Sequence, residues 1–206
     1  GINDDSAALL PHFVSHKLPF SVVSGSGEWT ICATPGGDLA TLDPERGCFS
    51  SIDAFGRPVP SATFMGGREF EVLTGGAVRT PWGDAVAHAL EQPVLILPSV
   101  QQGSGPFPHR TARWQPAAEG LDAETRFAAI SFYLAMMTAE CLGMTGGEDG
   151  DIIVEGPFAR NLLYLQMLFA STGRRVLADA TSATGTTFGA ALLASRAPAR
   201  VTPPVP

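Results

Sequence analysis

The last third of the chain alternates between short apolar runs and longer helical segments, and this alternation restricts the fold more than any other feature of the sequence. The runs DIIVEG at 151–156 and RRVLAD at 174–179 have the length and aliphatic content of buried strands. Each is followed by a helical segment, at 159–173 and 184–195 respectively. Because a β-α-β-α order packs helices against a sheet with parallel strands, the sequence predicts an α/β layer architecture.

A β-hairpin is predicted near the start of the chain. The segments FSVVSG at 20–25 and EWTICAT at 28–34 are strand-like, and they flank a turn of small residues, Gly-Ser-Gly at 25–27. A hairpin followed by β-α-β-α units indicates a mixed sheet with helices packed on it.

The middle of the chain is less regular. Segment 48–56 predicts a third strand, and 57–70 has the Gly and Pro content of a loop. Weak helical character is present at 82–91, and the apolar run PVLILP at 93–98 is typical of a strand buried on both faces. Segment 101–116 is rich in Gly and Pro and has no periodicity, so we expect a loop there.

One long helix is predicted to begin at Asp122 and to end at Gly143, with acidic residues in its first turn. Its apolar positions cover more than one face, which places it in the core. The Pro-rich tail at 196–206 has the composition of a poorly ordered terminus.

Composition restricts the partners of the chain. Its 206 residues suit one domain, and a net charge of −7 without a Lys/Arg cluster argues against nucleic acid or an anionic membrane as the main partner. No apolar run reaches about 18 residues, so no membrane-spanning helix is expected. Cys32, Cys48 and Cys141 lack the spacing of a zinc site and are typical of reduced thiols in a cytoplasmic protein.

The Gly-Ser-Gly turn does not fit the common site motifs. A G-x-G-x-x-G fingerprint would need glycine at Thr30, and a G-x-S-x-G elbow would need glycine at Ser24. Two interpretations remain: a plain tight turn, or a turn whose consecutive backbone N–H groups bind an anion. Asp4 and Asp5 precede a predicted helix, where an aspartate is suited either to cap the helix or to act as a general base.

Other polar and aromatic residues are expected at positions that need no functional explanation. Trp29 is expected in the core, with a stacking platform as the alternative. His12 and His16 are expected at the surface or at a helix edge. The segment FMGGREF at 64–70 predicts a surface loop, or else a contact to a sugar or to another domain.

Five segments, in this order along the chain, resemble one enzyme family. They are GINDDSAAL, GSGEW, LPSVQQGSGPFPHR, IIVEGPFARNLLYLQMLFASTGRRV and ATGTTFGAALLA. Together they resemble the C-terminal domain of the FGGY family of carbohydrate kinases, the relatives of glycerol kinase, xylulokinase, fuculokinase and rhamnulokinase. The resemblance implies a ribonuclease H-like α/β domain of the actin and hexokinase type over residues 1–195, with a mixed β-sheet, a β-hairpin and flanking helices.

The resemblance also implies a function for particular residues. Asp4 would be the catalytic base that accepts the proton of the attacking sugar hydroxyl. The phosphates of ATP would lie against the hairpin turn at Gly25, Ser26, Gly27 and Glu28. Adenosine would lie where a strand end meets a helix start, beside Gly156, Pro157, Arg160 and Asn161. His109 and Arg110, in the Gly/Pro-rich loop, would face either the substrate and the other domain or solvent.

Two residues depart from the family pattern. Glu28 stands where the family has Thr or Ser, and a carboxylate beside phosphates is repulsive unless a metal ion or an arginine intervenes. Pro157 stands where the family has a second glycine, so it fixes φ and removes an N–H, although proline is compatible with a helix start. These departures suggest a divergent subfamily with altered nucleotide contacts or reduced activity.

The N-terminal domain that the family implies is absent from these residues. That domain carries a phosphate loop, a metal-linked aspartate and most sugar-binding residues. We therefore expect this chain to supply no metal site and to need that domain as its partner in binding ATP, Mg²⁺ and a sugar or polyol. We also expect the chain to be inactive alone. Exposed apolar cleft surface would favour self-association. The alternative is a catalytically impaired nucleotide-binding or interaction domain of the same fold.

Overall fold

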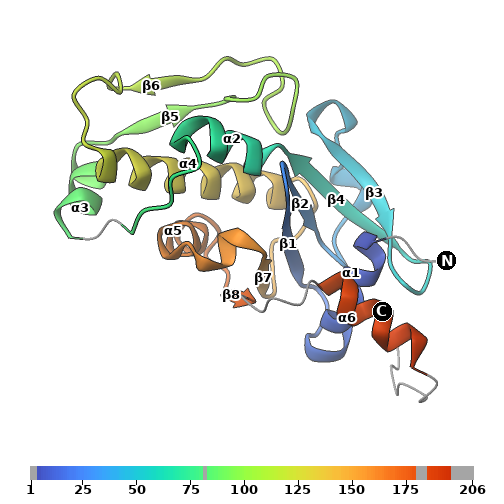
Figure 1. The fold of residues 1–206 in the computed structure, drawn as a ribbon. Coiled ribbons are helices and arrows are strands. Elements are labelled where there is room, and N and C mark those ends of the chain that lie inside the picture. Colours follow the sequence, from blue (N-terminus) through green and yellow to red (C-terminus); the bar gives the residue numbers. More distant parts are fainter. Residues whose placement is uncertain (1–3, 81–82, 180–184, 196–206) are drawn as a thin grey trace.

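The computed structural model describes residues 4–80, 83–179 and 185–195 (Figure 1). Its centre is a six-stranded sheet in the order β3-β4-β2-β1-β7-β8. The strands are β1 Ser21–Ser26, β2 Trp29–Ala33, β3 Cys48–Ile52, β4 Pro58–Phe64, β7 Ile152–Glu155 and β8 Val176–Asp179. β7 pairs in parallel with β1 and β8, and the other neighbours are antiparallel. The predicted mixed sheet is therefore confirmed, while the predicted tail at 196–206 lies outside the described residues.

Helices cover both faces of this sheet (Figure 1). Side chains alternate across a strand, so neighbouring residues of β1 reach different helices. Val22 packs in the cluster that contains Leu9 of α1, and Val23 packs in the cluster that contains Leu134 of α4. The helices are α1 Asp4–Ser15 and α6 Gly185–Ala194 on one face, and α2 Gly66–Thr74, α4 Ala123–Gly143 and α5 Leu162–Thr172 on the other.

The predicted hairpin and the predicted β-α-β-α unit are both confirmed. β1 and β2 pair up to Ser26 and Trp29, and Gly27 has a φ of 59° in the turn between them. α5 ends at Gly173, which has a φ of 67° and donates its N–H to Phe169 O. Glycine adopts positive φ values without the steric cost that other residues have, which is why glycine marks both positions in the sequence.

The long helix α4 forms the centre of the larger core. Asp122 caps it, because its side chain accepts the N–H groups of Glu124 and Thr125. The hydroxyl and N–H of Thr125 stabilise the charged carboxylate and hold the pKa of Asp122 below its ordinary value. Most of α4 is buried, and it contacts α2, α3 Asp84–Glu91 and α5. The predicted helix start at Asp122 and core position are confirmed.

The predicted loop at 57–70 is wrong. This segment forms β4, which pairs with β2 and β3, and the first half of α2. Pro58 and Pro60 lie in β4 itself, although proline lacks the N–H that strand pairing uses. Pro60 is tolerated because its carbonyl accepts from Thr34 N just beyond the last residue of β2, so its missing N–H faces the end of that strand.

The predicted buried strand at 93–98 and the loop at 101–116 also need correction. β5 Leu95–Leu97 is not in the main sheet; it pairs with β6 Arg113–Gln115 in a separate two-stranded ribbon above α4 (Figure 1). Leu95 is exposed, whereas Ile96 is buried, so only one face of β5 meets the core. The apolar run therefore reflects a short edge strand that alternates in the ordinary way.

A buried carboxylate joins α2 to α4. Glu69 is 1% exposed, and its two oxygens accept Gln101 N and the Tyr133 hydroxyl, both at 2.9 Å. Burial raises the pKa of Glu69, and these two hydrogen bonds oppose that rise. Burial and the nearby Glu69 carboxyl also raise the pKa of Tyr133, so the tyrosine remains a donor.

Glu69→Gln is expected to change how stability depends on pH. The pKa of Glu69 is higher in the folded protein than in the unfolded chain. The protonated side chain therefore contributes its full stability below the ordinary pKa of 4.5, and this contribution is lost as the pH rises through the pKa of the folded protein. Glutamine cannot ionise, so the free energy of unfolding of the variant should rise relative to that of the wild type as the pH rises above 4.5. Urea unfolding at about pH 5 and about pH 8 measures this gain, and a pH-independent difference would contradict it.

Three further expectations concern the cysteines, membrane-spanning helices and His12. Cys32, Cys48 and Cys141 are free and buried, as predicted. Within the described residues, no helix is both long and apolar enough to cross a membrane. His12 is buried at 6% exposure, so it does not lie at the surface; it lies in the last turn of α1, which is the helix-edge alternative.

Candidate functional site

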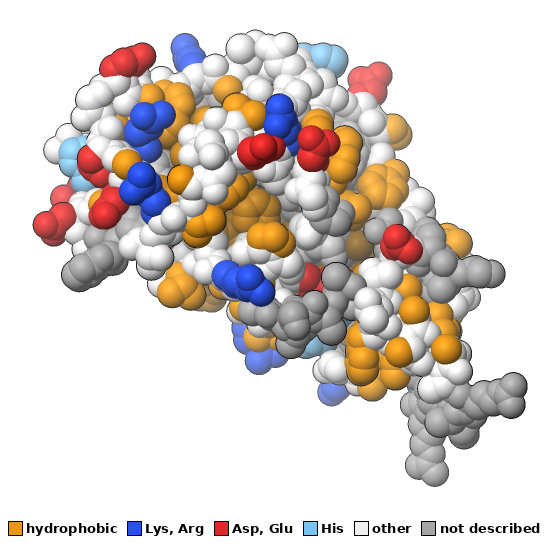
Figure 2. Space-filling model, in the orientation of Figure 1, with side chains coloured by type: hydrophobic (Ala, Val, Ile, Leu, Met, Phe, Trp, Pro, Cys, Tyr) orange, Lys and Arg blue, Asp and Glu red, His pale blue; other side chains and the backbone are white. Residues whose placement is uncertain are grey.

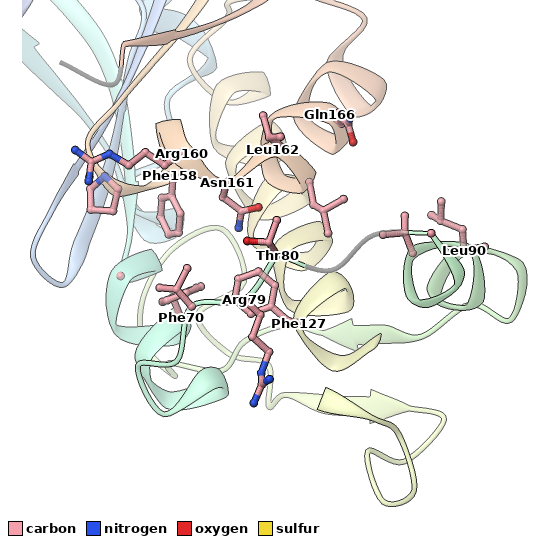
Figure 3. Close-up of a pocket in the computed structure, with 18 of the residues that line it drawn as sticks. Phe70, Arg79, Thr80, Leu90, Phe127, Phe158, Arg160, Asn161, Leu162 and Gln166 are labelled. Carbon is pink, nitrogen blue, oxygen red and sulfur yellow. The ribbon is translucent and has the colours of Figure 1, made fainter. Parts of the chain in front are cut away.

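A cavity of about 780 Å³ opens between the hairpin tip, α2, α3 and the segment that leads into α5 (Figure 3). Ligand pockets in proteins usually measure about 300–1,000 Å³, so this one can hold a nucleotide-sized molecule. Figure 2 shows a hollow on this face with apolar side chains inside it and basic side chains near its edge. Five residues predicted from the resemblance line the cavity: Gly25, Gly27, Pro157, Arg160 and Asn161.

The hairpin and the end of β7 are in close contact at the cavity. A Cβ placed on Gly156 would lie 2.8 Å from the Gly25 carbonyl oxygen, and Gly156 has a φ of 75°. A Cβ on Gly25 would meet the Pro157 ring at 3.7 Å. The structure therefore brings together the two segments that the resemblance assigns to phosphates and to adenosine. Ser26 belongs to β1, and its side chain is outside the described set.

The start of α2 forms another wall, which sequence reasoning missed. Gly67 lines the cavity, and a Cβ there would overlap the Gly27 carbonyl oxygen. Arg68 N donates to Glu28 O at 3.1 Å, so the helix start is bonded to the hairpin turn. The Gly-Gly pair at 66–67 was a signal for this contact, but it predicts a turn equally well.

Aromatic side chains from separate elements line the interior of the site. Phe70 of α2 meets Phe127 of α4 edge-to-face at 5.9 Å, and meets Phe158 at 6.0 Å (Figure 3). Trp29 also lines the cavity and is 42% exposed, so the prediction that it lies in the core is wrong. An apolar interior with an open aromatic edge is suited to a flat, partly apolar ligand.

Two arginines supply positive charge at this cavity. Arg79 and Arg160 are exposed lining residues, and neither has a carboxylate partner among the described residues. Figure 3 shows Arg160 beside Phe158 and Arg79 beside Phe127. Unpaired guanidinium groups at a pocket edge are suited to phosphate oxygens, which they bind with charge-assisted hydrogen bonds.

Asn161 shapes the cavity through contacts inside the protein. It caps α5, because its Oδ1 accepts Tyr164 N at 3.2 Å, and its Nδ2 donates to Ser131 Oγ of α4 at 2.9 Å. The preceding turn, η3 Pro157–Arg160, is thereby fixed between β7 and α5. One side-chain N–H remains for a ligand.

Asn161→Ala is expected to lower the free energy of unfolding by about 1–2 kcal/mol, because it removes the helix cap and leaves Ser131 without its donor. Asn161→Asp keeps the capping oxygen and loses only the donor, so its loss should be smaller. Urea unfolding of both variants tests this ranking. Equal stability of Asn161→Ala and wild type would contradict the capping role.

The remaining predicted residues lie elsewhere. Asp4 is exposed at the first residue of α1, which lies across the hairpin from α2 and α5 (Figure 1), and it does not line the cavity. Its carbonyl oxygen accepts the Thr186 hydroxyl at 3.3 Å. His109 and Arg110 are exposed between β5 and β6, with Arg110 over the ring of Phe107 at 5.6 Å, and they do not line the cavity either.

No cluster of three or more His, Cys, Asp or Glu side chains that could hold a metal ion occurs in the described ranges.

The chain is an α/β domain with a mixed sheet, helices on both faces and a ligand-sized cavity beside a hairpin, and its similarity to solved structures makes it ribonuclease H-like. Solved kinases have the same fold. A carbohydrate kinase from Novosphingobium aromaticivorans superimposes with a TM-score of 0.78 and 32% identity over 92% of this chain and 44% of its own length. Xylulose kinase from Bifidobacterium adolescentis superimposes with a TM-score of 0.66 and 18% identity, over 100% of this chain and 42% of its own length. Plasmodium falciparum glycerol kinase with ADP superimposes with a TM-score of 0.66 and 14% identity, over 93% of this chain and 41% of its own length.

The sequence matches the family described as carbohydrate kinase FGGY, C-terminal domain, over residues 17–203, and the chain belongs to this family. The family and fold expected from the sequence are thus confirmed. The chain spans less than half the length of the kinases compared above. No curated protein matches it.

Proposed function

We propose that this chain is the nucleotide-side half of a carbohydrate kinase that transfers the γ-phosphate of ATP to a hydroxyl group of a sugar or polyol. Its domain would cover 1–195, with a Pro-rich tail at 196–206, and it would act together with an N-terminal domain. The observation that carries the proposal is the cavity in which the hairpin glycines and the β7–η3 junction meet, although about 130 residues separate them in sequence.

The nucleotide would lie across this cavity. Its phosphates would approach the hairpin turn at Gly25, Ser26, Gly27 and Glu28, where glycine allows close contact with the backbone. Its adenosine would occupy the apolar part, beside Gly156, Pro157, Arg160 and Asn161. The guanidinium groups of Arg79 and Arg160, which have no carboxylate partner among the described residues, would offset the phosphate charge.

The charge of Glu28 is compatible with this placement. Glu28 is exposed, and its backbone carbonyl, not its carboxylate, is fixed by Arg68 N. The side chain is therefore free to turn away from the phosphates or toward a cation. Mg²⁺ would be held by the phosphates and by the N-terminal domain, because Mg²⁺ is usually bound by one or two carboxylates together with the phosphates of a substrate.

Asp4 would act as the general base. Phosphoryl transfer depends mainly on positioning and on an oriented nucleophile, and a carboxylate can accept the proton of a sugar hydroxyl as that oxygen attacks the γ-phosphate. The exposure of Asp4 leaves its carboxylate accessible, as a base must be. Its place across the hairpin from the cavity would put adenosine and sugar on opposite sides of the β1–β2 turn.

The second candidate is a nucleotide-binding or interaction domain with impaired catalysis. Pro157 begins η3 at the proposed adenosine contact, where it removes an N–H, and Glu28 adds a negative charge at the proposed phosphate contact. A kinase and an impaired nucleotide-binding domain both predict nucleotide binding, so turnover separates these two.

The test uses the protein with its N-terminal half and screens pentuloses, hexuloses and polyols for ATP-dependent ADP release. The kinase proposal expects turnover with at least one acceptor. An intact protein that binds ATP in calorimetry but phosphorylates nothing in this panel would support the impaired domain instead. For this chain alone we expect no turnover and at most weak ATP binding, because half of the cleft is missing; tight binding would contradict that expectation.

A further inference from the structure

The side chain of Glu155 connects three segments on the face of the sheet opposite the nucleotide cavity. Its Oε1 lies 2.8 Å from His12 Nε2 of α1, and its Oε2 accepts the Ser24 hydroxyl of β1 at 2.9 Å. Both oxygens of one carboxylate are therefore engaged, and the side chain is only 12% exposed. A carboxylate at this depth is unusual unless it is paired and hydrogen-bonded, as it is here.

The three segments that Glu155 joins are those on which the proposed function depends. Ser24 directly precedes Gly25 of the hairpin, and Glu155 directly precedes Gly156 at the adenosine end of the cavity. His12 lies two turns along α1 from Asp4. A movement of any one segment would therefore stretch a hydrogen bond to the same carboxylate.

The surroundings hold this carboxylate in place. A Cβ on Gly185, the first residue of α6, would lie 2.7 Å from Glu155 Oε1, so the start of α6 approaches this carboxylate closely only because residue 185 is glycine. Glu155 and His12 also line a separate cavity of about 440 Å³ on this face. The His12 ring packs against the rings of Phe20 at 6.4 Å and His16 at 6.0 Å. His16 itself faces Asp151, at 3.6 Å, and not Glu155.

We propose that Glu155 is a positioning residue for the nucleotide: it holds the hairpin turn and the Gly156–Pro157 junction in register with α1, without touching the ligand. The inference rests on the proposed function, because it assigns ATP to the cavity. Loss of these hydrogen bonds would let the hairpin separate from the β7–η3 junction, and small displacements of positioning groups have large kinetic effects.

The test compares Glu155→Ala and His12→Ala with the control His16→Ala in the intact protein. His16 is the matched control because it is a histidine just beyond the end of α1 that contacts the His12 ring and faces Asp151, but makes no hydrogen bond to Glu155. We expect Glu155→Ala to raise KM for ATP by about tenfold to a hundredfold, with little change in KM for the sugar. His12→Ala should raise KM for ATP less, and His16→Ala should leave KM for ATP unchanged.

A conservative variant separates hydrogen bonding from simple packing. Glu155→Gln keeps an oxygen that accepts from Ser24 and a polar group that faces His12, so its KM for ATP should stay within about twofold of wild type. Ser24→Ala combined with Glu155→Ala should raise KM no further than Glu155→Ala alone, because both changes remove the same contact. Hydrogen exchange, which needs no nucleotide, should become faster at 24–28 and at 156–160 in Glu155→Ala, while α4 keeps its protection.

The outcomes distinguish this inference from the proposed function. A wild type that uses ATP, together with a folded Glu155→Ala whose KM for ATP is unchanged, overturns the positioning role and leaves the kinase proposal intact. A lower melting temperature of Glu155→Ala with unchanged KM and unchanged exchange at 24–28 also overturns it. A wild type that neither binds ATP nor phosphorylates any acceptor overturns the proposed function and this inference together.

Discussion

Asp4→Asn should lower kcat of the intact kinase by about 10²–10⁴-fold, because an amide cannot accept the proton of the attacking hydroxyl. The fold should be preserved, since the contact of residue 4 with Thr186 uses its main-chain carbonyl oxygen. Because Asp4 does not line the nucleotide cavity, KM for ATP should change little. Steady-state kinetics with the acceptor found in the panel measures both parameters.

The neighbouring carboxylate gives the control for this prediction. Asp5→Asn changes the same functional group one position further along and should leave kcat within about threefold of wild type. The assignment of the base to Asp4 would be wrong if Asp5→Asn abolished turnover while Asp4→Asn did not.

Gly67→Ala should weaken nucleotide binding by about tenfold to a hundredfold. The added methyl group would overlap the Gly27 carbonyl oxygen, so α2 and the hairpin turn must separate at the cavity wall. Overpacking of this kind also costs about 1–3 kcal/mol of stability. Calorimetric titration of the intact protein with ATP, alongside urea unfolding, measures both effects.

Gly143→Ala is the matched control for Gly67→Ala. Gly143 also lies in a helix, but a Cβ there meets no atom within 4 Å. Alanine is the better helix former, so this variant should be neutral or slightly stabilising and should bind ATP as the wild type does. If both variants bound ATP normally, the start of α2 would have no part in the site.

Local chemistry explains which elements the sequence predicts correctly. The Asp122 carboxylate caps α4 with its own side chain, and Gly27 and Gly173 take positive φ values that other residues avoid. Each of these signals depends only on residues within one turn of the chain. The hairpin, α4 and α5 are therefore visible in the sequence alone.

Long-range packing explains the errors. The prolines of 57–70 predict a loop, yet Pro60 fits β4 because β2 ends beside it. His12 is a polar residue that the sequence places at a surface or at a helix edge, and its partner Glu155 is remote in sequence. Nothing near either residue records which segment will lie against it.

The candidate site is predictable only where the family resemblance reaches. The resemblance indicates Gly25, Gly27 and Pro157, which the fold does bring to one cavity. It gives no site role to Gly67 or to Trp29, although Trp29 ends the GSGEW segment, because a Gly-Gly pair and a tryptophan in a strand have commoner structural explanations. Their presence at the cavity follows from how α2 and β2 meet, which requires the completed sheet.

The parallel pairing of β1 with β7 has a consequence for the order of folding. It joins strands about 130 residues apart, and such non-local pairings form late because the intervening chain must first be ordered. During synthesis the hairpin, α2, α3 and α4 emerge before β7 and α5 exist, so a nascent chain stopped before β7 lacks the side of the cavity that Pro157, Arg160 and Asn161 form. Acquisition of ligand affinity would then mark the last step of folding, and a nascent chain stopped before β7 would gain no protection from nucleotide.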